Sequence, residues 1–409
     1  MLSRRKLLKT LSSTPFIGGL LGSGLIGSSK VAASPLLRRR NYFKELGVRT
    51  FINAAGTYTM MTASLMRDEV MDAINFASNE YVMLDDLQDK VGERIAKLVK
   101  CEAATVTAGA ASALTLGTAS ILSGMDEKKV VQIPHLEGTG MKTEVIMQKS
   151  HEFGYAHAIR NCGVKIIYIE TRKELEEAIN ENTAFMLFLN ANNYVGKIED
   201  KEWVEVGKKY NIPTFNDCAA DVPPVENLWK YTEMGFDLVC FSGGKGIRGP
   251  QSAGLLLGKK DLIAAARLHA PPRGNTVGRG MKVNKEEVLG MMVALEQYIA
   301  NDHEKEWKMW EAQIAHINDA VQSVDGVTTE VVVPEVANHV PTLNITWDNN
   351  KIKTTNAELK EVLRNGHPSI EVAGWGDGAI SITTWMMVPG QERIVAEKVR
   401  DALQGAATT

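Results

Sequence analysis

The sequence predicts an α/β protein with a mostly parallel, seven-stranded sheet sandwiched by helices, followed by a small α+β C-terminal domain. Continuous apolar runs alternate with amphipathic helical patterns, such as 172–180 and 201–210, and strands of this kind are typical of parallel sheets covered on both faces. The seven runs are 104–107, 130–133, 165–169, 184–189, 212–215, 238–241 and 253–257. After a long helical stretch from Lys285 to about Val321, strand patterns at 343–345 and 380–382 and a last helix from Gln391 indicate the second domain.

The predicted domain organisation has four parts. Residues 1–33 read as a leader, because Ser3-Arg4-Arg5 followed by apolar residues and Lys9 resembles the twin-arginine export motif. This predicts a periplasmic or otherwise exported protein, with a disordered basic tail as the alternative. Residues 34–67 form an N-terminal arm, 68–290 the large cofactor-binding domain, and 291–409 the connector helix and small domain.

Composition excludes several classes of function. The hydrophobic share is 44% and the charged share 23%, as in ordinary globular proteins. A net charge of -3 gives no basic surface for nucleic acid. No apolar run beyond the leader is long enough to span a bilayer, so no stable membrane association is expected after its removal. The four cysteines have no metal-binding spacing, and we expect no metal.

The strongest chemical signal is the glycine-rich segment from Phe241 to Gln251, which follows a predicted buried strand. Lys245 lies in this turn without bulky neighbours. A lysine that is desolvated there has a lowered pKa and forms Schiff bases readily. A solvated loop lysine is the alternative interpretation of this motif alone.

Two further features support a cofactor site. Asp217 follows the strand at 212–215, and ligands bind at the carboxyl edge of parallel strands, where a carboxylate can hold a pyridine nitrogen protonated. Thr107 to Leu114 opens a helix of small residues whose free N–H groups suit a phosphate, with hydroxyls available from Ser112 and Ser242. Alone, Asp217 is equally a turn aspartate, and the helix start is a common motif.

Along the chain, the phosphate-binding helix start comes first, then Asp217 and then Lys245. Features of these kinds in this order resemble the fold-type I pyridoxal-phosphate enzymes. The stretch from Leu46 to about Leu295 is similar to the selenocysteine synthase-like group, which includes glucosaminate-6-phosphate ammonia lyase. The segments that carry the resemblance are 47–58, 102–116, 242–258 and 278–287.

The resemblance implies pyridoxal 5'-phosphate as cofactor, Lys245 as its Schiff-base lysine and Asp217 as the partner of the pyridine nitrogen. It implies contacts to the phosphate from Gly109, Ala110 and Ser112, with Ser242 nearby. His151 is expected to stack on the cofactor ring, with a capping or core histidine as the alternative. The residues expected to reach the substrate are Asn53, Thr57, Tyr58, Arg248, Arg273 and Arg279, although each arginine is equally an ordinary surface residue.

The expected reaction begins with a carbanion at Cα of a small amino-acid or amino-sugar-acid-like amine, with Lys245 as acid and base. Elimination at Cβ (an ammonia lyase) or β-replacement is favoured by the resemblance, and aminotransferase, racemase or aldolase chemistry is the alternative. The strand at 379–384 lacks the arginine with which many aminotransferases bind the substrate carboxylate. A non-catalytic protein of this fold is disfavoured by the intact Lys245, Asp217 and Ser242. A homodimer or a higher homo-oligomer is expected.

Overall fold

The computed structural model describes residues 40–374 and 379–407. The chain divides into two units, residues 1–49 and 50–409. In the described part of the first unit, helix α2 spans Tyr42–Leu46. The Asn41 side chain caps its first turn, and Gly47 ends it in the left-handed conformation with φ of 69°. The predicted leader, residues 1–33, lies outside the described residues.

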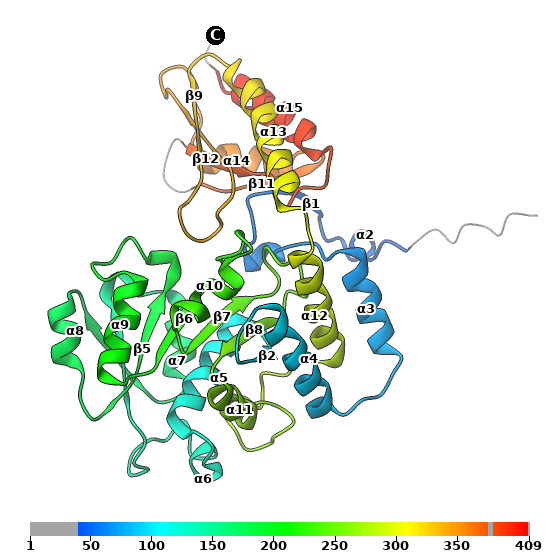
Figure 1. Cartoon of the computed structure of the whole chain (residues 1–409). Coiled ribbons are helices and arrows are strands. Elements are labelled where there is room, and N and C mark those ends of the chain that lie inside the picture. The colour runs from blue at the N-terminus through cyan, green and yellow to red at the C-terminus, as the bar shows by residue number, and fades with distance from the viewer. Residues whose placement is uncertain (1–39, 375–378, 408–409) are drawn as a thin grey trace, which may run out of the picture. The chain divides into compact units, whose positions relative to one another are not determined.

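The second unit contains the predicted seven-stranded sheet (Figure 1). Its strand order is β2-β8-β7-β6-β5-β3-β4, and β8 alone runs antiparallel to its two neighbours. The strands are β2 (Ala103–Thr107), β3 (Glu144–Gln148), β4 (Lys165–Ile169), β5 (Thr183–Leu189), β6 (Thr214–Asp217), β7 (Leu238–Ser242) and β8 (Gly254–Gly258). The α/β fold with a mostly parallel sheet is therefore confirmed.

Helices bury both faces of this sheet, as the two sets of alternating side chains on its strands show. On β7, Val239 and Phe241 belong to one core cluster, while Leu238 and Cys240 belong to the other. The helices are α3 (Asp68–Ser78), α4 (Leu84–Leu98), α5 (Gly109–Ser123), α6 (Glu127–Val130), α7 (His157–Arg160), α8 (Arg172–Ala178), α9 (Asp200–Tyr210), α10 (Asn227–Met234), α11 (Lys260–His269) and α12 (Lys285–Ile299).

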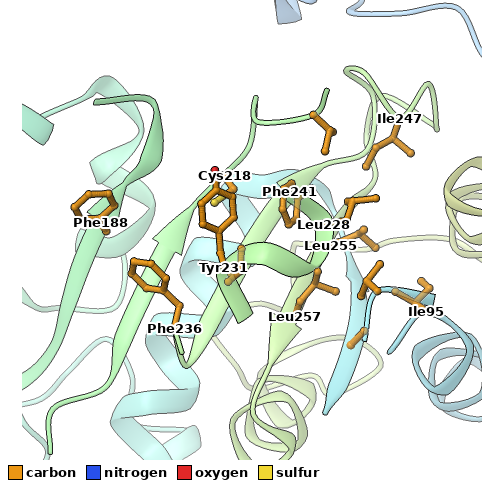
Figure 2. Close-up of a cluster of buried hydrophobic side chains, with 14 of the residues drawn as sticks. Ile95, Phe188, Cys218, Leu228, Tyr231, Phe236, Phe241, Ile247, Leu255 and Leu257 are labelled. Carbon is orange, nitrogen blue, oxygen red and sulfur yellow. The ribbon is translucent and has the colours of Figure 1, made fainter. Parts of the chain in front are cut away.

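The first core cluster draws on α4, α9, α10 and α12, and Figure 2 shows part of it, including Phe188, Tyr231 and Phe241. The second draws on α5, α7 and α11. Burial of each large apolar side chain stabilises the fold by roughly 1.5–3 kcal/mol before the entropy of ordering is subtracted. The central strands β6 and β7 are therefore packed between two apolar cores.

The C-terminal part forms the small α+β domain. A three-stranded antiparallel sheet has the order β12-β10-β9, and β1 pairs in parallel with β11. Its strands are β1 (Phe51–Ala54), β9 (Val327–Val332), β10 (Thr342–Trp347), β11 (Ser369–Val372) and β12 (Ala379–Thr383), and its helices are α13 (His303–Gln322), α14 (Asn356–Asn365) and α15 (Gln391–Gly405). Residues of the predicted N-terminal arm thus supply a strand to the small domain.

Two local predictions from the sequence are wrong. The run 130–133 is not a strand, because Asp126 accepts a hydrogen bond from the Lys128 N–H and starts the short helix α6 there. Residues 144–148 supply the strand instead. The long connector is two helices, since α12 ends at Ile299 and the Asp302 side chain caps α13. The predicted domain boundary at residue 290 falls inside α12, whose buried residues belong to the core of the large sheet.

Four 3-10 turns also contain residues discussed below: η1 (Thr59–Met61), η2 (Lys149–His151), η3 (Gly154–Ala156) and η4 (Asn190–Asn192). Across the described ranges, none of the helices has both the length and the apolar character that crossing a bilayer requires.

Candidate active site

Lys245 lies in a tight turn that follows β7. The Gly243 N–H donates to Ala253 O at 2.9 Å, and the Ser64 hydroxyl donates to the Gly244 carbonyl at 2.6 Å. A Cβ on Gly246 would lie 2.2 Å from the Val222 carbonyl oxygen, so glycine is required where the turn passes this backbone. The turn therefore fixes the lysine between strand β7 and the segment after β6.

The Lys245 amine is largely buried, and this burial lowers its pKa below the usual lysine value. Asp217 and Asp221 oppose this shift because their negative charges favour the ammonium form. Within the described residues, no side chain or carbonyl hydrogen-bonds to the amine. A lysine of this kind has the neutral form available as a nucleophile.

Asp217 ends strand β6, where its backbone pairs with that of Cys240 on β7. Only 4% of its surface is exposed. Its carboxylate accepts a hydrogen bond from the Ala219 N–H at 3.0 Å, and the Cys240 thiol lies 3.7 Å from the same oxygen. Burial raises the pKa of Asp217, against the lowering effect of Ala219 and Lys245. No ion pair within 4 Å involves this carboxylate among the residues that the structure describes.

A second buried carboxylate, Asp221, follows four residues later and was not identified from the sequence. It is 1% exposed and accepts a hydrogen bond of 2.6 Å from the Asn190 amide, which also donates to Tyr231 Oη. Burial raises the pKa of Asp221 to about 7, and the charge of Asp217 adds to the shift. The Asp-x-x-x-Asp spacing was the available signal, but it does not show that both acids face one lysine.

The predicted phosphate-binding residues lie at the start of α5. Gly109 has φ of 83°, and the preceding Ala108 provides no side-chain cap for the first N–H groups of the helix. The Ser112 hydroxyl donates to the Ala108 carbonyl at 2.8 Å and so stabilises this first turn. Residues 108–111 are partly exposed, which leaves the N–H groups at Gly109 and Ala110 accessible to an anion.

Strand β8 connects this helix start to the lysine turn. Gly254 pairs with Ser242 on β7, and a Cβ on Gly254 would lie only 2.6 Å from the Gly109 carbonyl carbon. The structure therefore brings Gly109, Ala110, Ser242 and the lysine turn to one end of the sheet.

These groups fit pyridoxal phosphate. An uncapped helix start suits the phosphate, and a buried carboxylate without a cationic hydrogen-bond partner suits a protonated pyridine nitrogen. An amine of lowered pKa suits the aldehyde. Lys245, Asp217 and the first turn of α5 would hold the cofactor.

A cavity of about 360 Å³ opens beside Lys245. Arm residues Gly56, Thr57 and Tyr58 form one part of its lining, and small-domain residues such as Thr383 and Trp385 form another. Its volume falls in the usual range for small-molecule sites. The predicted substrate residues Thr57 and Tyr58 therefore do line a cavity with the lysine.

His151 does not line this cavity. It is 0% exposed, its Nδ1 accepts the Leu189 N–H at 3.1 Å, and its Nε2 lies 3.1 Å from Asn192 O. Its ring packs edge-on against Phe188, and burial lowers its pKa to about 4. The stacking role predicted for His151 has no support in this arrangement. Tyr155 in η3, which is 64% exposed, lines the cavity instead.

Asn53 and Arg248 hold backbone segments. Asn53 Oδ1 accepts the N–H groups of Ala55 and Gly56, and its amide donates to the Gly56 carbonyl at 2.9 Å, so it shapes the arm loop that lines the cavity. Arg248 is mostly buried and donates to the Trp385 carbonyl, which joins the lysine turn to the small domain. Neither side chain lines the cavity.

Arg273 and Arg279 are not brought to the cavity either. Arg273 forms an ion pair of 2.7 Å with Asp85, a residue shared with Arg267. Arg279 lines a separate recess with Lys282. The sequence marked both arginines as candidates to bind substrate, but neither lines the cavity beside Lys245.

Known proteins resemble this chain in sequence and in fold. The chain is 27% identical over 380 residues to D-glucosaminate-6-phosphate ammonia lyase of Salmonella typhimurium, covering 90% of this chain and 99% of that protein. The solved structure of a D-glucosaminate-6-phosphate ammonia lyase superposes with a TM-score of 0.78 and 26% identity over 90% of this chain and 99% of that one. A structure of SPT with pyridoxal phosphate has a TM-score of 0.56 at 12% identity, covers 87% of this chain and 88% of that one, and shows likeness of fold alone.

The expected periplasmic location is wrong. The enzymes that the chain matches, an ammonia lyase and selenium transferases that act on seryl-tRNA, are cytoplasmic. The family model that describes SelA, L-seryl-tRNA selenium transferase, matches residues 51–331, well over half of the sequence. The chain therefore belongs to the SelA family and is an enzyme whose cofactor is pyridoxal phosphate.

Proposed function

We propose that the protein is an ammonia lyase that acts on an amino-sugar acid, a 2-amino acid with a hydroxyl on Cβ. The observation that carries this is the cavity beside Lys245, which the arm and the small domain line with hydroxyl groups. The likeness to D-glucosaminate-6-phosphate ammonia lyase over 90% of the chain supports the same reaction type.

The positions of the residues support the following proposed roles. Bound pyridoxal phosphate withdraws electrons from the substrate Cα. Lys245, whose neutral amine is available, removes the Cα proton, and Asp217 holds the pyridine nitrogen protonated. The N–H groups at Gly109 and Ala110 bind the phosphate, with Ser242 close by, while Ser112 stabilises that helix turn.

The net reaction balances without any further reactant. The Cβ hydroxyl leaves with a proton as water, and one water is consumed when the C–N bond is hydrolysed. The products are ammonia and a 2-keto acid with CH₂ at Cβ. An aminotransferase would instead need a second substrate to return the amine. Many aminotransferases bind the substrate carboxylate with an arginine of the small domain, and strand β12, Ala379–Thr383, has none.

The test is a panel of D- and L-2-amino acids with and without a Cβ hydroxyl, incubated with the loaded enzyme. We expect equal amounts of ammonia and 2-keto acid from a β-hydroxylated substrate without added keto acid. Keto acid that forms only when an amine acceptor is added would show transamination and contradict the proposal.

We also propose a homodimer. Several large apolar side chains between Tyr58 and Met83 are exposed, and they include Met60, Leu65, Phe76 and Tyr81. An apolar surface of this kind is typical of a protein interface. In a dimer, Arg279 is the candidate to reach the cavity of the partner. Sedimentation equilibrium should give twice the chain mass, and the variant Tyr81→Asp should shift it towards one chain.

A further inference from the structure

The Cys240 thiol contacts the carboxylate that is proposed to hold the pyridine nitrogen. Cys240 on β7 pairs with Asp217 on β6, so the two side chains leave the same face of the sheet. Both residues are buried, with 0% and 4% of their surfaces exposed. The thiol donates a hydrogen bond to Asp217 Oδ1 across 3.7 Å. Cys240 therefore lies where it can control the orientation of Asp217.

The thiol can act only as a donor in this contact. Burial raises the pKa of the Cys240 thiol well above its usual value, and the negative charge of Asp217 raises it further. The sulfur therefore keeps its proton, which it can share with the carboxylate oxygen. This hydrogen bond favours the ionised form of Asp217, against the effect of burial, which raises the pKa of that carboxyl.

Two donors reach the same oxygen of Asp217. The Ala219 N–H donates to Oδ1 at 3.0 Å from the segment after β6, and the Cys240 thiol donates to the same atom from β7. Donors from two segments on one oxygen restrict rotation of the carboxylate about its Cβ–Cγ bond. Among the residues that the structure describes, Oδ2 has no hydrogen-bond partner, which leaves it available to a protonated ring nitrogen.

We propose that Cys240 is a positioning residue for the cofactor: its thiol and the Ala219 N–H hold Asp217 Oδ1 so that Oδ2 faces the pyridine nitrogen. This inference rests on the role proposed for Asp217. It does not depend on the substrate or on the type of reaction.

A second buried cysteine provides the matched control. Cys162 is also 0% exposed and belongs to the same core cluster as Cys240. Its thiol donates to the Thr115 carbonyl at 3.3 Å instead of to a carboxylate. Cys162→Ala therefore removes the same volume and the same kind of donor from the same core without touching Asp217.

The first experiment titrates the Asp217 carboxyl in the cofactor-free protein. Carbon NMR of protein labelled at its aspartate carboxyls follows the titration, and the signal missing from Asp217→Asn identifies the residue. Loss of a hydrogen bond to the ionised form should raise the pKa of Asp217 in Cys240→Ala and in Cys240→Val. The acid dissociation constant should fall about threefold to tenfold in both. The charges of Lys245 and Asp221, which also act on this carboxyl, remain in every variant.

The two Cys240 variants separate the hydrogen bond from packing, because alanine is smaller than cysteine and valine is larger. A shift in the same direction in both supports the lost donor, whereas shifts in opposite directions would show a packing effect. A titration of Asp217 that is unchanged in both variants, or that shifts as far in Cys162→Ala, would also overturn the inference.

The second experiment measures the affinity for pyridoxal phosphate by absorbance titration. A carboxylate that has lost one of its two donors must be ordered when the cofactor binds. Cys240→Ala and Cys240→Val should therefore each bind the cofactor about threefold to tenfold more weakly than the parent. Cys162→Ala should bind it like the parent.

Parent-like affinity in both Cys240 variants, or an equal loss in Cys162→Ala, would refute the positioning role of Cys240 and leave the role of Asp217 standing. Parent-like affinity in Asp217→Asn would instead contradict the role proposed for Asp217 itself. The two failures are therefore distinguishable in one set of titrations.

Discussion

Replacement of Asp217 by asparagine tests the electrostatic basis of the site. The change keeps the size of the side chain and leaves an oxygen that can accept the Ala219 N–H, which now donates to the carboxylate at 3.0 Å. It removes the negative charge. The neighbours within hydrogen-bond reach are that N–H and the Cys240 thiol, both neutral. Lys245 acts on the carboxylate only from beyond ion-pair distance, so a cation in direct contact would come only with the bound cofactor.

The magnitude follows from the burial of this carboxylate, which is 4% exposed. Removal of one partner of a buried charge pair costs roughly 3–5 kcal/mol. At 1.36 kcal/mol for each factor of ten, this predicts a fall in kcat/KM of roughly two to four orders of magnitude. Ammonia release from a β-hydroxylated substrate measures it.

The cofactor-free protein should respond in the opposite direction. Burial raises the pKa of Asp217, so the ionised carboxylate destabilises the fold as the pH rises above the unfolded value of about 3.9. Without cofactor, the Asp217→Asn protein should therefore melt at or above the parent temperature at pH 8. Asp200→Asn, which changes a comparably buried aspartate in α9, should leave activity intact. An Asp217→Asn enzyme within tenfold of the parent kcat/KM would refute the reasoning.

Three further changes have distinct expected outcomes. Gly254→Ala places a methyl 2.6 Å from the Gly109 carbonyl carbon, and this overpacking, worth about 1–3 kcal/mol, should shift the start of α5. Binding of pyridoxal phosphate, measured by absorbance titration, should then weaken tenfold or more. An unchanged affinity would argue against a phosphate site there. Asp221→Asn should raise the melting temperature of the cofactor-free protein above that of the parent. The difference should grow from pH 4 to about pH 7 and then level, because burial raises the pKa of Asp221 to about 7. A difference that does not depend on pH would contradict this. His151→Ala should lower the free energy of unfolding, measured in urea, by about 1–3 kcal/mol, because it leaves the Leu189 N–H without an acceptor. Loss of cofactor binding with unchanged stability would instead support a stacking role.

The sequence was sufficient for the parts of the site that are local along the chain. Lys245 and the start of α5 each follow a buried strand directly, and Asp217 ends one, so the order of strands places them at the same edge of the sheet. The strand pattern also predicted seven strands, although one was assigned to residues 130–133 in place of Glu144–Gln148. There the capping by Asp126 outweighed the apolar run.

The residues that sequence reasoning missed depend on contacts between distant segments. Thr383 and Trp385 reach the cavity because the small domain lies against the lysine turn, which Arg248 joins to the Trp385 carbonyl. His151 lies away from the cavity because the Leu189 N–H and the Asn192 carbonyl hold its ring in the core. Neither contact has a signal in the spacing of residues along the chain.

The central claim is that Lys245 carries pyridoxal phosphate. The near-visible absorption spectrum of the purified protein, recorded beside that of Lys245→Ala after both are incubated with the cofactor, tests it most directly. We predict an absorbance band in the parent that borohydride fixes covalently to the chain at Lys245, and no such fixation in the variant. A parent that stays colourless with added pyridoxal phosphate, or a variant labelled as efficiently as the parent, would contradict the account.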